Sequence, residues 1–362
     1  MSMATTTMSI DLRAATDSRR AREVLLLPLE FGRNIADLMV TIHHDPDRGW
    51  HEAAVERTQD LKLSPAAKVF HYGCEIFEGH KAYRWPDDRV ALFRPELNAE
   101  RLNASARRMC MPEIPVEMQL LATHALVDKL RAWVPGFEDS ALYLRPTMIG
   151  TEPALGVAVS RTHLYLILAS PVGPYFKAGT AITVWIETED VRAVRGGVGF
   201  AKAGGNYAGG MAAQQRAKKK GYDQVAFLDA IERRYLEEMH AMNVMIVEQD
   251  EIVTPPVSGT ILQGITRQSV LECAPDLGFR AAERPIDIED LASKLSEGRV
   301  REMFAVGTAA VITSIGKIHY KDKDYTVGDG RPGPVARRVY EAITDVQYGR
   351  RADPYGWMRV VE

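Results

Sequence analysis

Glycines surround Lys202 in the stretch Gly196-Gly197-Val198-Gly199-Phe200-Ala201-Lys202-Ala203-Gly204-Gly205-Asn206-Tyr207. Glycine lets the backbone adopt positive φ angles and lets a ligand come close, so such a loop can form a binding site. A lysine that is partly removed from water can lose its proton and form a Schiff base with a carbonyl group. An exposed lysine on a flexible loop is the more common outcome, so other segments must decide between the two.

Three other segments favour a binding site. Gly264-Ile265-Thr266 opens an expected helix, whose free backbone amides can bind a phosphate, although a plain helix N-cap is the simpler interpretation. Gly307-Thr308-Ala309 follows an expected strand and can also present amides to an anion. Glu237-Glu238 lies in an apolar hairpin, where a buried glutamate would need a cationic partner. A reactive lysine, two anion-binding loops and a buried carboxylate together match the needs of pyridoxal phosphate.

The composition indicates an ordinary soluble globular protein. The chain has 362 residues, 46% hydrophobic and 26% charged, with a net charge of −3, and its length favours two domains. Charges of both signs are mixed, so we expect neither nucleic acid nor a membrane as a partner. The three cysteines form no disulfide framework and we expect no secretory signal, which together favour a cytoplasmic protein. His43-His44, beside Asp45 and Asp47, is typical of a solvated loop, so we expect no metal site.

A segment rich in proline and glycine divides the sequence into two halves. We expect residues 1–22 to be disordered, residues 23–170 to form a small domain, residues 171–182 to be a linker and residues 183–362 to form a larger domain. Apolar runs predict strands over 90–93, 141–144, 164–169, 181–186, 223–229, 235–236, 243–247 and 303–306. Helical spacing predicts helices over 95–110, 118–134, 207–220 and 266–274, and a closing helix after a turn at 328–333.

A series of short motifs runs in order from about residue 30 to the C-terminus. They are His71-Tyr72 with Phe77-Glu78-Gly79; Phe93-Arg94-Pro95 with Arg101-Leu102; Leu142-Tyr143-Leu144-Arg145-Pro146 with Gly150-Thr151-Glu152-Pro153; Lys202 with Gly204-Gly205-Asn206-Tyr207; Glu238 with Met242-Asn243; Gly264-Ile265-Thr266-Arg267; Gly307-Thr308-Ala309; and Trp357-Met358. In this series the chain resembles the branched-chain amino acid aminotransferases, which are pyridoxal phosphate enzymes of fold type IV.

The resemblance implies an α/β (α+β) fold with two domains, a small α/β domain and a larger pseudo-barrel domain that binds the cofactor. It implies a ping-pong transfer of the amino group between a branched-chain L-amino acid (leucine, isoleucine or valine) and 2-oxoglutarate, with pyridoxal 5'-phosphate as the cofactor. Members of the family are at least dimeric, so the resemblance also implies a homodimer.

The resemblance assigns roles by position. Lys202 would bind the cofactor covalently and move the substrate proton, Tyr207 would bond the cofactor's phenolic oxygen, and Glu238 would pair with its pyridine nitrogen. The residues expected to hold the phosphate are Arg101, Ile265, Thr266 and Thr308. Those expected to bind substrate are Thr308, Ala309 and Tyr72 at the carboxylate; Phe31, Tyr72, Phe77, Tyr143 and Tyr175 around the apolar side chain; Arg145 at the γ-carboxylate of glutamate; and Leu155 and Val157 from the partner subunit.

The sequence departs from the family pattern beside Glu238. His240 stands where glycine is usual, and Ala241 where glycine or threonine is usual, in a turn that borders the substrate pocket of the family. The His240 side chain would either point to solvent or intrude on this pocket. In the second case the same chemistry would serve a smaller or more polar donor than leucine, so the preferred donor stays open. A fold type IV lyase is the other alternative, against which the aromatic set and Arg145-Pro146 argue.

Overall fold

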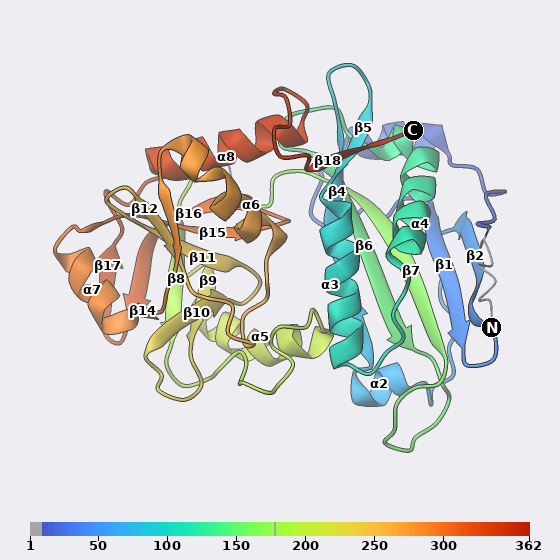
Figure 1. The fold of residues 1–362 in the computed structure, drawn as a ribbon, viewed down its shortest axis with the longest axis horizontal. Coiled ribbons are helices and arrows are strands. Elements are labelled where there is room, and N and C mark those ends of the chain that lie inside the picture. The colour runs from blue at the N-terminus through green and yellow to red at the C-terminus, as the bar shows by residue number, and fades with distance from the viewer. Residues whose placement is uncertain (1–8, 177–178) are drawn as a thin grey trace, which may run out of the picture. The chain divides into compact units, whose positions relative to one another are not determined.

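A computed structural model describes residues 9–176 and 179–362 of the chain (Figure 1). The chain divides into two compact units. Unit 1 comprises the chain up to Gly173 together with Gln347–Glu362, and unit 2 comprises Pro174–Val346. Each unit combines helices with a large sheet, which confirms the predicted α/β class.

Unit 1 is built on an eight-stranded antiparallel sheet with the order β18-β5-β4-β6-β7-β1-β2 and with β3 paired to β6. Its strands are β1 (Leu38–Asp45), β2 (Gly49–Arg57), β3 (Glu75–Phe77), β4 (His80–Arg84), β5 (Val90–Phe93), β6 (Ala141–Gly150), β7 (His163–Val172) and β18 (Met358–Val361). The central strands β6 and β7 are buried along most of their length, as their nearly continuous apolar sequences predict.

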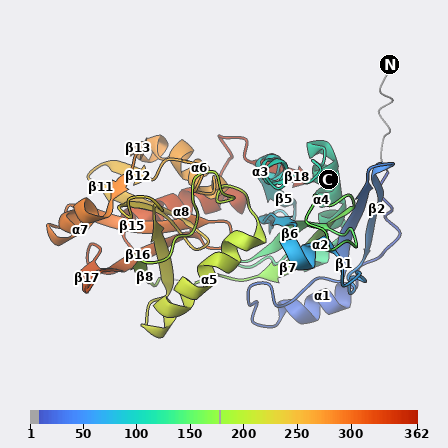
Figure 2. The same ribbon diagram turned by 90° about the horizontal axis from the view of Figure 1, so that it is seen from below.

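Helices α3 (Pro95–Arg108) and α4 (Val116–Lys129) pack together on one face of this sheet (Figures 1 and 2). Helix α3 starts with Pro95, whose fixed φ angle and missing N–H suit a first turn. Helix α4 buries Ala122, Leu126 and Val127, which share one helical face. The other helices of the unit are α1 (Ser18–Leu25), α2 (Lys68–Tyr72) and the 3₁₀ turn η1 (Arg131–Trp133).

Unit 2 is built on a ten-stranded sheet that closes on itself. Strands β11, β15, β16, β8, β9 and β10 are paired in this order, and β10 pairs back to β11, which gives a barrel. The strands are β8 (Ile182–Glu187), β9 (Gln224–Leu228), β10 (Tyr235–Met239), β11 (Asn243–Glu248), β12 (Glu251–Thr254), β13 (Arg280–Glu283), β14 (Ile286–Asp287), β15 (Val300–Gly307), β16 (Val311–Tyr320) and β17 (Lys323–Thr326). This ring matches the pseudo-barrel that the sequence resemblance implies.

Four helices surround the barrel: α5 (Gly204–Lys219), α6 (Ile265–Cys273), α7 (Ile288–Ser296) and α8 (Pro334–Gln347), with a 3₁₀ turn η2 (Pro275–Leu277) after α6. Helix α5 lies on β8 and β9, where Ala213 and Ala217 pack against Val225 and Phe227 in a fully buried cluster. This packing holds the C-terminal half of α5 and leaves its N-terminal half to other contacts.

The domain boundaries differ from the expected ones in two places. Residues 347–362, assigned above to the larger domain, belong to unit 1 because β18 pairs with β5 from Met358–Phe93 to Val361–Val90. Residues 9–22, assigned above to a disordered segment, are ordered: Asp11 forms a bridge with Ala54, and Ala21 of α1 is fully buried. Residues 1–8 lie outside the described part of the chain. The division between the units falls at 173/174, inside the expected linker 171–182.

Across residues 9–176 and 179–362, no helix combines the length and apolar character that crossing a membrane requires. The same residues contain no group of three or more His, Cys, Asp or Glu side chains arranged to hold a metal ion. His43 and His44 end strand β1 and do not lie in a loop, in contrast to the expectation above.

Candidate active site

Lys202 lies just before helix α5, and its Nζ atom donates a hydrogen bond to the Tyr207 hydroxyl at 2.8 Å. Tyr207 belongs to the first turns of α5. Asn206 closes the loop, because its side-chain amide donates to the carbonyl oxygens of Val198 and Ala201, both at 2.8 Å. The loop and the helix start together hold an amine beside a phenol.

The loop requires glycine at positions 196 and 199, for two different reasons. Gly196 has a φ of +81°, which a residue with a Cβ rarely adopts. Gly199 has an ordinary φ but no room: a Cβ there would lie 2.4 Å from the Cβ of Ala193 and 2.6 Å from the carbonyl oxygen of Thr260. One glycine therefore serves the turn, and the other serves the close packing of the loop.

Glu238, in β10, is only 2% exposed. Its Oε1 atom forms an ion pair with Arg192 at 2.8 Å and accepts the backbone N–H of Leu262 at 2.8 Å. Its Oε2 atom accepts the Asn243 side-chain amide at a longer 3.2 Å. A carboxylate has about four acceptor positions, so Oε2 keeps capacity for one more donor.

Burial raises the pKa of Glu238 to about 7, although the Arg192 guanidinium, the Leu262 amide and the charge of Lys202 all lower it. The desolvation cost thus exceeds the stabilisation by these partners. Glu237 precedes it on the opposite face of the strand, where the Thr260 hydroxyl donates to it and burial also raises its pKa. Glu238 is the more deeply buried of the two and the one that faces Arg192.

Asn243 connects this carboxylate to the start of helix α6. Its amide donates both to Glu238 and to the carbonyl oxygen of Leu262, at 3.2 and 3.0 Å. A Cβ on Gly264 would lie 2.0 Å from the Asn243 side-chain oxygen, so only glycine fits there. Helix α6 follows at Ile265, and no side chain caps it. Its first amide groups are therefore fixed near Glu238 and are suited to binding an anion.

Thr308 and Ala309 form the turn between β15 and β16. A Cβ on Gly307 would lie 3.3 Å from the Met242 side chain and 3.7 Å from the carbonyl oxygen of Ala241. The turn that follows Glu238 therefore packs against the start of this second turn. The structure thus brings the predicted residues of unit 2 other than Tyr175 to one end of the barrel: Lys202, Tyr207, Glu238, Ile265, Thr266, Thr308 and Ala309.

His240 takes neither of the two orientations considered from the sequence. Its side chain is partly exposed, but its Nε2 atom lies 2.8 Å from the backbone oxygen of Tyr207, so the imidazole lies on helix α5. The exposed side of the same turn is occupied by Ala241.

In unit 1, Arg101 is held by a buried glutamate. Arg101 donates from Nε and Nη2 to the two oxygens of Glu78, at 2.7 and 2.9 Å. Asn98 and the backbone N–H of Gly79 also donate to Glu78, at 2.8 and 3.1 Å. Glu78 is 1% exposed. A two-point arginine–carboxylate pair of this kind fixes the guanidinium in both position and orientation.

The predicted aromatic residues Phe31, Phe77 and Tyr143 cluster around Arg145 in unit 1. The rings of Phe31 and Tyr143 are 4.7 Å apart, and the Arg145 guanidinium lies 4.8 Å from the Phe77 ring. Arg145 also donates to the Tyr143 hydroxyl at 3.0 and 3.2 Å. A Cβ on Gly79 would lie 2.1 Å from that hydroxyl, so Gly79 gives the tyrosine its room. An apolar wall and a cation therefore occur together in unit 1.

The four other predicted substrate residues make different contacts. Tyr72, on α2, donates to the carbonyl oxygen of Leu155. Leu155 and Val157 are 64% and 86% exposed. Tyr175 belongs to unit 2, where its ring packs edge-on against Phe176 at 4.9 Å.

Arg192 and Glu78 are the residues that the sequence reasoning did not identify as partners. The need for a cation beside a buried glutamate was apparent from the sequence, but nothing distinguished Arg192 from other arginines. Glu78 lay within a quoted motif, yet its pairing with Arg101 depends on the packing of α3 near β3. Both pairs join residues far apart in the chain, and local patterns do not report such contacts.

Comparison with known proteins agrees with this geometry. The family profile "Amino-transferase class IV" matches residues 75–318. The chain is 46% identical to the branched-chain-amino-acid aminotransferase of Mycolicibacterium smegmatis, over 97% of each chain. Among solved structures it resembles the T.th. branched-chain amino acid aminotransferase, both with pyridoxamine 5'-phosphate (TM-score 0.76) and complexed with N-(5'-phosphopyridoxyl)-L-glutamate (TM-score 0.74). Each comparison has 27% identity and covers 91% of this chain and 100% of the other. The chain belongs to the class IV aminotransferases, among their branched-chain-amino-acid aminotransferases.

Proposed function

We propose that this enzyme transfers the amino group of leucine, isoleucine or valine to 2-oxoglutarate, giving branched 2-oxo acids and L-glutamate, with pyridoxal 5'-phosphate as its cofactor. The observation that carries the proposal is the Lys202–Tyr207 hydrogen bond of 2.8 Å beside the buried Glu238. The name of the 46% identical relative supports the substrate class. The phosphopyridoxyl ligands of the solved neighbours support the cofactor.

The residues of unit 2 fit pyridoxal phosphate. When bound, the cofactor supplies an electron sink for the negative charge that develops at the substrate Cα. Lys202 would hold the cofactor covalently, and its amine would move the proton of the substrate Cα. Tyr207 orients this amine and donates to the phenolic oxygen of the cofactor. Ile265, Thr266, Thr308 and Arg101 hold the phosphate.

Glu238 keeps the pyridine nitrogen protonated. A carboxylate whose pKa burial raises to about 7 gains most from a neighbouring positive charge, because that charge offsets the cost of its desolvation. Arg192 and Leu262 occupy Oε1, while Oε2 has only the longer contact with Asn243 among the described residues. Glu238 would therefore have capacity on Oε2 for the ring N–H.

One pocket must accept both an aliphatic side chain and the γ-carboxylate of glutamate. The apolar wall consists of Phe31, Phe77 and Tyr143. The cation is Arg145, which is hydrogen-bonded to the Tyr143 hydroxyl. Tyr175 extends the wall, and Tyr72, with the amides of Thr308 and Ala309, receives the substrate carboxylate.

We propose a homodimer in which Leu155 and Val157 reach the partner's site. They lie with Phe70 and Val159 among the exposed apolar residues of unit 1, between 58% and 86% exposed. The segment that carries them is fixed to α2 by the buried Lys68, which binds Glu152 at 2.8 Å. An exposed apolar segment is typical of an interface.

We place the enzyme in the cytoplasm, because the three cysteines are free thiols: Cys74, Cys110 and Cys273.

The test is Lys202→Ala, with Lys220→Ala at the end of α5 as the control. We expect Lys202→Ala to abolish both the visible absorbance of bound cofactor and the transfer from leucine to 2-oxoglutarate, and we expect the control to keep both. Borohydride reduction and peptide mapping of the wild type identify the modified lysine. A cofactor label on another lysine would overturn the assignment, and a panel of amino donors would reveal any preference other than leucine.

A further inference from the structure

The first half of α5 carries Tyr207 but has little helical stability of its own. Gly204, Gly205, Gly209 and Gly210 all lie in the helix, and no side chain caps its start. Glycine is among the weakest helix formers, and no side-chain cap adds stability to the first turn. Contacts from outside the helix must therefore keep Tyr207 in place.

His240 makes such a contact from the turn after β10. Its Nε2 atom lies 2.8 Å from the backbone oxygen of Tyr207. A carbonyl oxygen only accepts, so the hydrogen sits on Nε2. The backbone N–H of His240 donates to the carbonyl oxygen of Val225 in β9, at 3.1 Å. The imidazole is thereby tied to the barrel on one side and to α5 on the other.

Gly210 leaves room for the imidazole. A Cβ at position 210 would lie 2.6 Å from Cδ2 and 3.0 Å from Nε2 of His240, closer than these atoms can pack. The ring centroids of His240 and Tyr207 are 6.0 Å apart. The histidine and the glycine are therefore complementary. Glycine at position 210 makes the helix less stable, but it leaves space in which the imidazole packs beside Tyr207.

The turn that carries His240 also follows Glu238 directly. It is closed by the backbone bond from Met239 to Met242, at 2.9 Å. One short segment therefore links the carboxylate proposed for the pyridine nitrogen to the helix that presents the phenol to Lys202.

We propose that His240 is a positioning residue, which clamps the first turns of α5 and so keeps the Tyr207 hydroxyl against the Lys202 amine. Its effect on catalysis rests on the function proposed above, whereas the clamp itself does not. Without the clamp, Tyr207 moves while Arg145 and the aromatic cluster stay unchanged. Substituting His240 therefore lowers kcat equally for all amino donors and leaves their ranking intact.

Hydrogen–deuterium exchange on the full chain, with and without pyridoxal phosphate, tests the clamp. His240→Phe fills the space without a donor, His240→Gln keeps an N–H at a similar reach, and Ala241→Ser is the control in the same turn. We expect amides 205–211 to exchange about tenfold faster in His240→Phe, as the loss of one hydrogen bond allows. Exchange there should be unchanged in His240→Gln and in the control. Unchanged exchange over 205–211 in His240→Phe would overturn the proposal.

A second substitution tests the fit between the two residues. Gly210→Ala should increase exchange over 205–211 in the wild type, because the methyl group meets the imidazole. In a His240→Gly background the same change should decrease exchange, because alanine favours the helix. An effect of the same sign and size in both backgrounds would show that the residues are not coupled.

Kinetics separate this proposal from the proposed function. We expect His240→Phe to lower kcat about tenfold for both leucine and glutamate with KM unchanged, and His240→Gln to restore it. If wild-type transamination is absent while exchange responds as expected, the function fails and the clamp stands. If transamination is present and the donor ranking changes in His240→Phe, the residue determines specificity and the positioning role is overturned.

Discussion

Each unit contains a deeply buried glutamate paired with an arginine, Glu78 with Arg101 in unit 1 and Glu238 with Arg192 in unit 2, but the two pairs are built differently. Glu78 in unit 1 receives both ends of the Arg101 guanidinium, an asparagine and a backbone amide. Glu238 in unit 2 receives a single contact from Arg192, the backbone amide of Leu262 and a longer contact from Asn243, and burial raises its pKa to about 7. The first pair has the geometry of a structural anchor. The second is an incomplete site, which gains stability when a further cation binds.

The largest effect is expected from removing the anchor. Glu78→Gln leaves the Arg101 charge largely buried without its counter-charge, which should lower the free energy of unfolding by about 3–5 kcal/mol. Urea unfolding of the cofactor-free enzyme measures this loss. The control is Glu96→Gln on α3, the helix that carries Arg101. Its partner Arg359 has a side chain that is 47% exposed, so this substitution should cost less than about 1 kcal/mol. Equal losses in both variants would remove the distinction between anchor and surface pair.

The incomplete pair should show itself in the pH dependence of stability. The folded-state pKa of Glu238 is about 7, above its ordinary value of 4.5, so the folded protein binds this proton more tightly than the unfolded chain. Its contribution to the free energy of unfolding therefore falls by roughly 3 kcal/mol as the pH rises from 4.5 to 7.

The measurement is the unfolding of cofactor-free wild type and Glu238→Gln at pH 5 and pH 8. Relative to Glu238→Gln, the wild type should have a lower free energy of unfolding at pH 8 than at pH 5. Pyridoxal phosphate should make this pH-dependent change smaller. A difference that is independent of pH would mean that Glu238 ionises normally in the folded protein.

Unit 1 should respond to pH in the opposite direction. His80 is buried, both of its ring nitrogens lack a hydrogen-bond partner among the described residues, and burial lowers its pKa to about 4. The unfolded chain takes up a proton near pH 6.5, so the stability that the neutral ring contributes is complete above 6.5. It is lost as the pH falls toward 4, by roughly 3 kcal/mol in total.

Replacing His80 with glutamine removes this titration. The free energy of unfolding of His80→Gln should fall less than that of the wild type between pH 7 and pH 4. His71→Gln, at an exposed position of α2, serves as the control and should follow the wild type. Identical acid dependence in all three proteins would exclude His80 as a cause of acid unfolding in unit 1.

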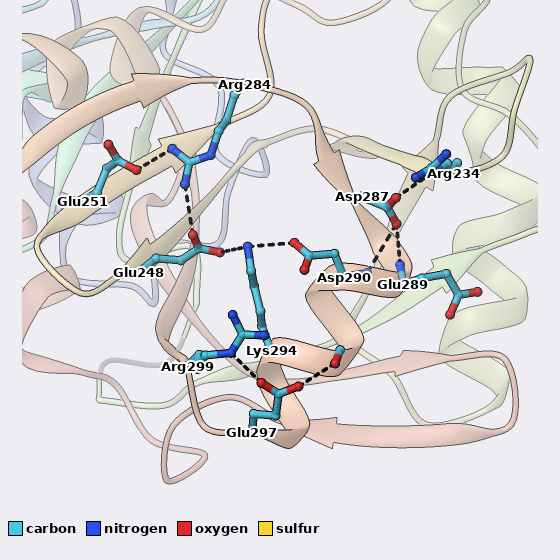
Figure 3. A network of polar contacts seen from close by, with 11 residues as sticks. Arg234, Glu248, Glu251, Arg284, Asp287, Glu289, Asp290, Lys294, Glu297 and Arg299 are labelled. Carbon is cyan, nitrogen blue, oxygen red and sulfur yellow. Dashed lines mark hydrogen bonds and ion pairs between the residues drawn. The ribbon is translucent and has the colours of Figure 1, made fainter.

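The smallest effect is expected where ion pairs are numerous but accessible to water. Figure 3 shows such a network on unit 2, in which Glu248 binds Lys294 at 2.9 Å and Arg284 at 3.0 Å. Lys294→Met should change the free energy of unfolding by about 1 kcal/mol or less, and the change should shrink in 1 M salt. A loss as large as that of Glu78→Gln would show that the number of contacts matters more than their burial.

The sequence predicted elements where the local pattern is strong. Strand β5 coincides with the prediction over 90–93, and α3, α6 and the closing helix α8 were placed within a few residues. Helix α5 begins at Gly204, before the predicted start at 207, because its first turns consist of glycines that local propensity assigns to a loop. Strands β1 and β2 escaped prediction, since charged and histidine residues interrupt their apolar pattern.

The candidate site divides in the same way. Lys202, Tyr207 and Glu238 could be found because they lie in local motifs, and the structure places them at one end of the barrel. The contacts of Arg192, Asn243 and His240 could not be found in this way, because they join segments that are distant in the chain. The orientation of His240 could not be predicted from the sequence. It depends on the space that the missing side chain of Gly210 leaves, and this space exists beside His240 only once the helix has folded.

The return of the chain to unit 1 has a consequence for how the protein is made. Strand β18 completes the edge of the first sheet by pairing with β5, yet it follows the whole of unit 2 in the chain. During synthesis the ribosome therefore releases β5 long before its partner exists, and an unpaired edge strand is a template for aggregation. Emergence of residues 358–361 from the ribosome, and not of unit 2, is the event that allows this edge to close. Ribosome-bound chains lacking 358–361 should accordingly depend on chaperones more than the released protein does.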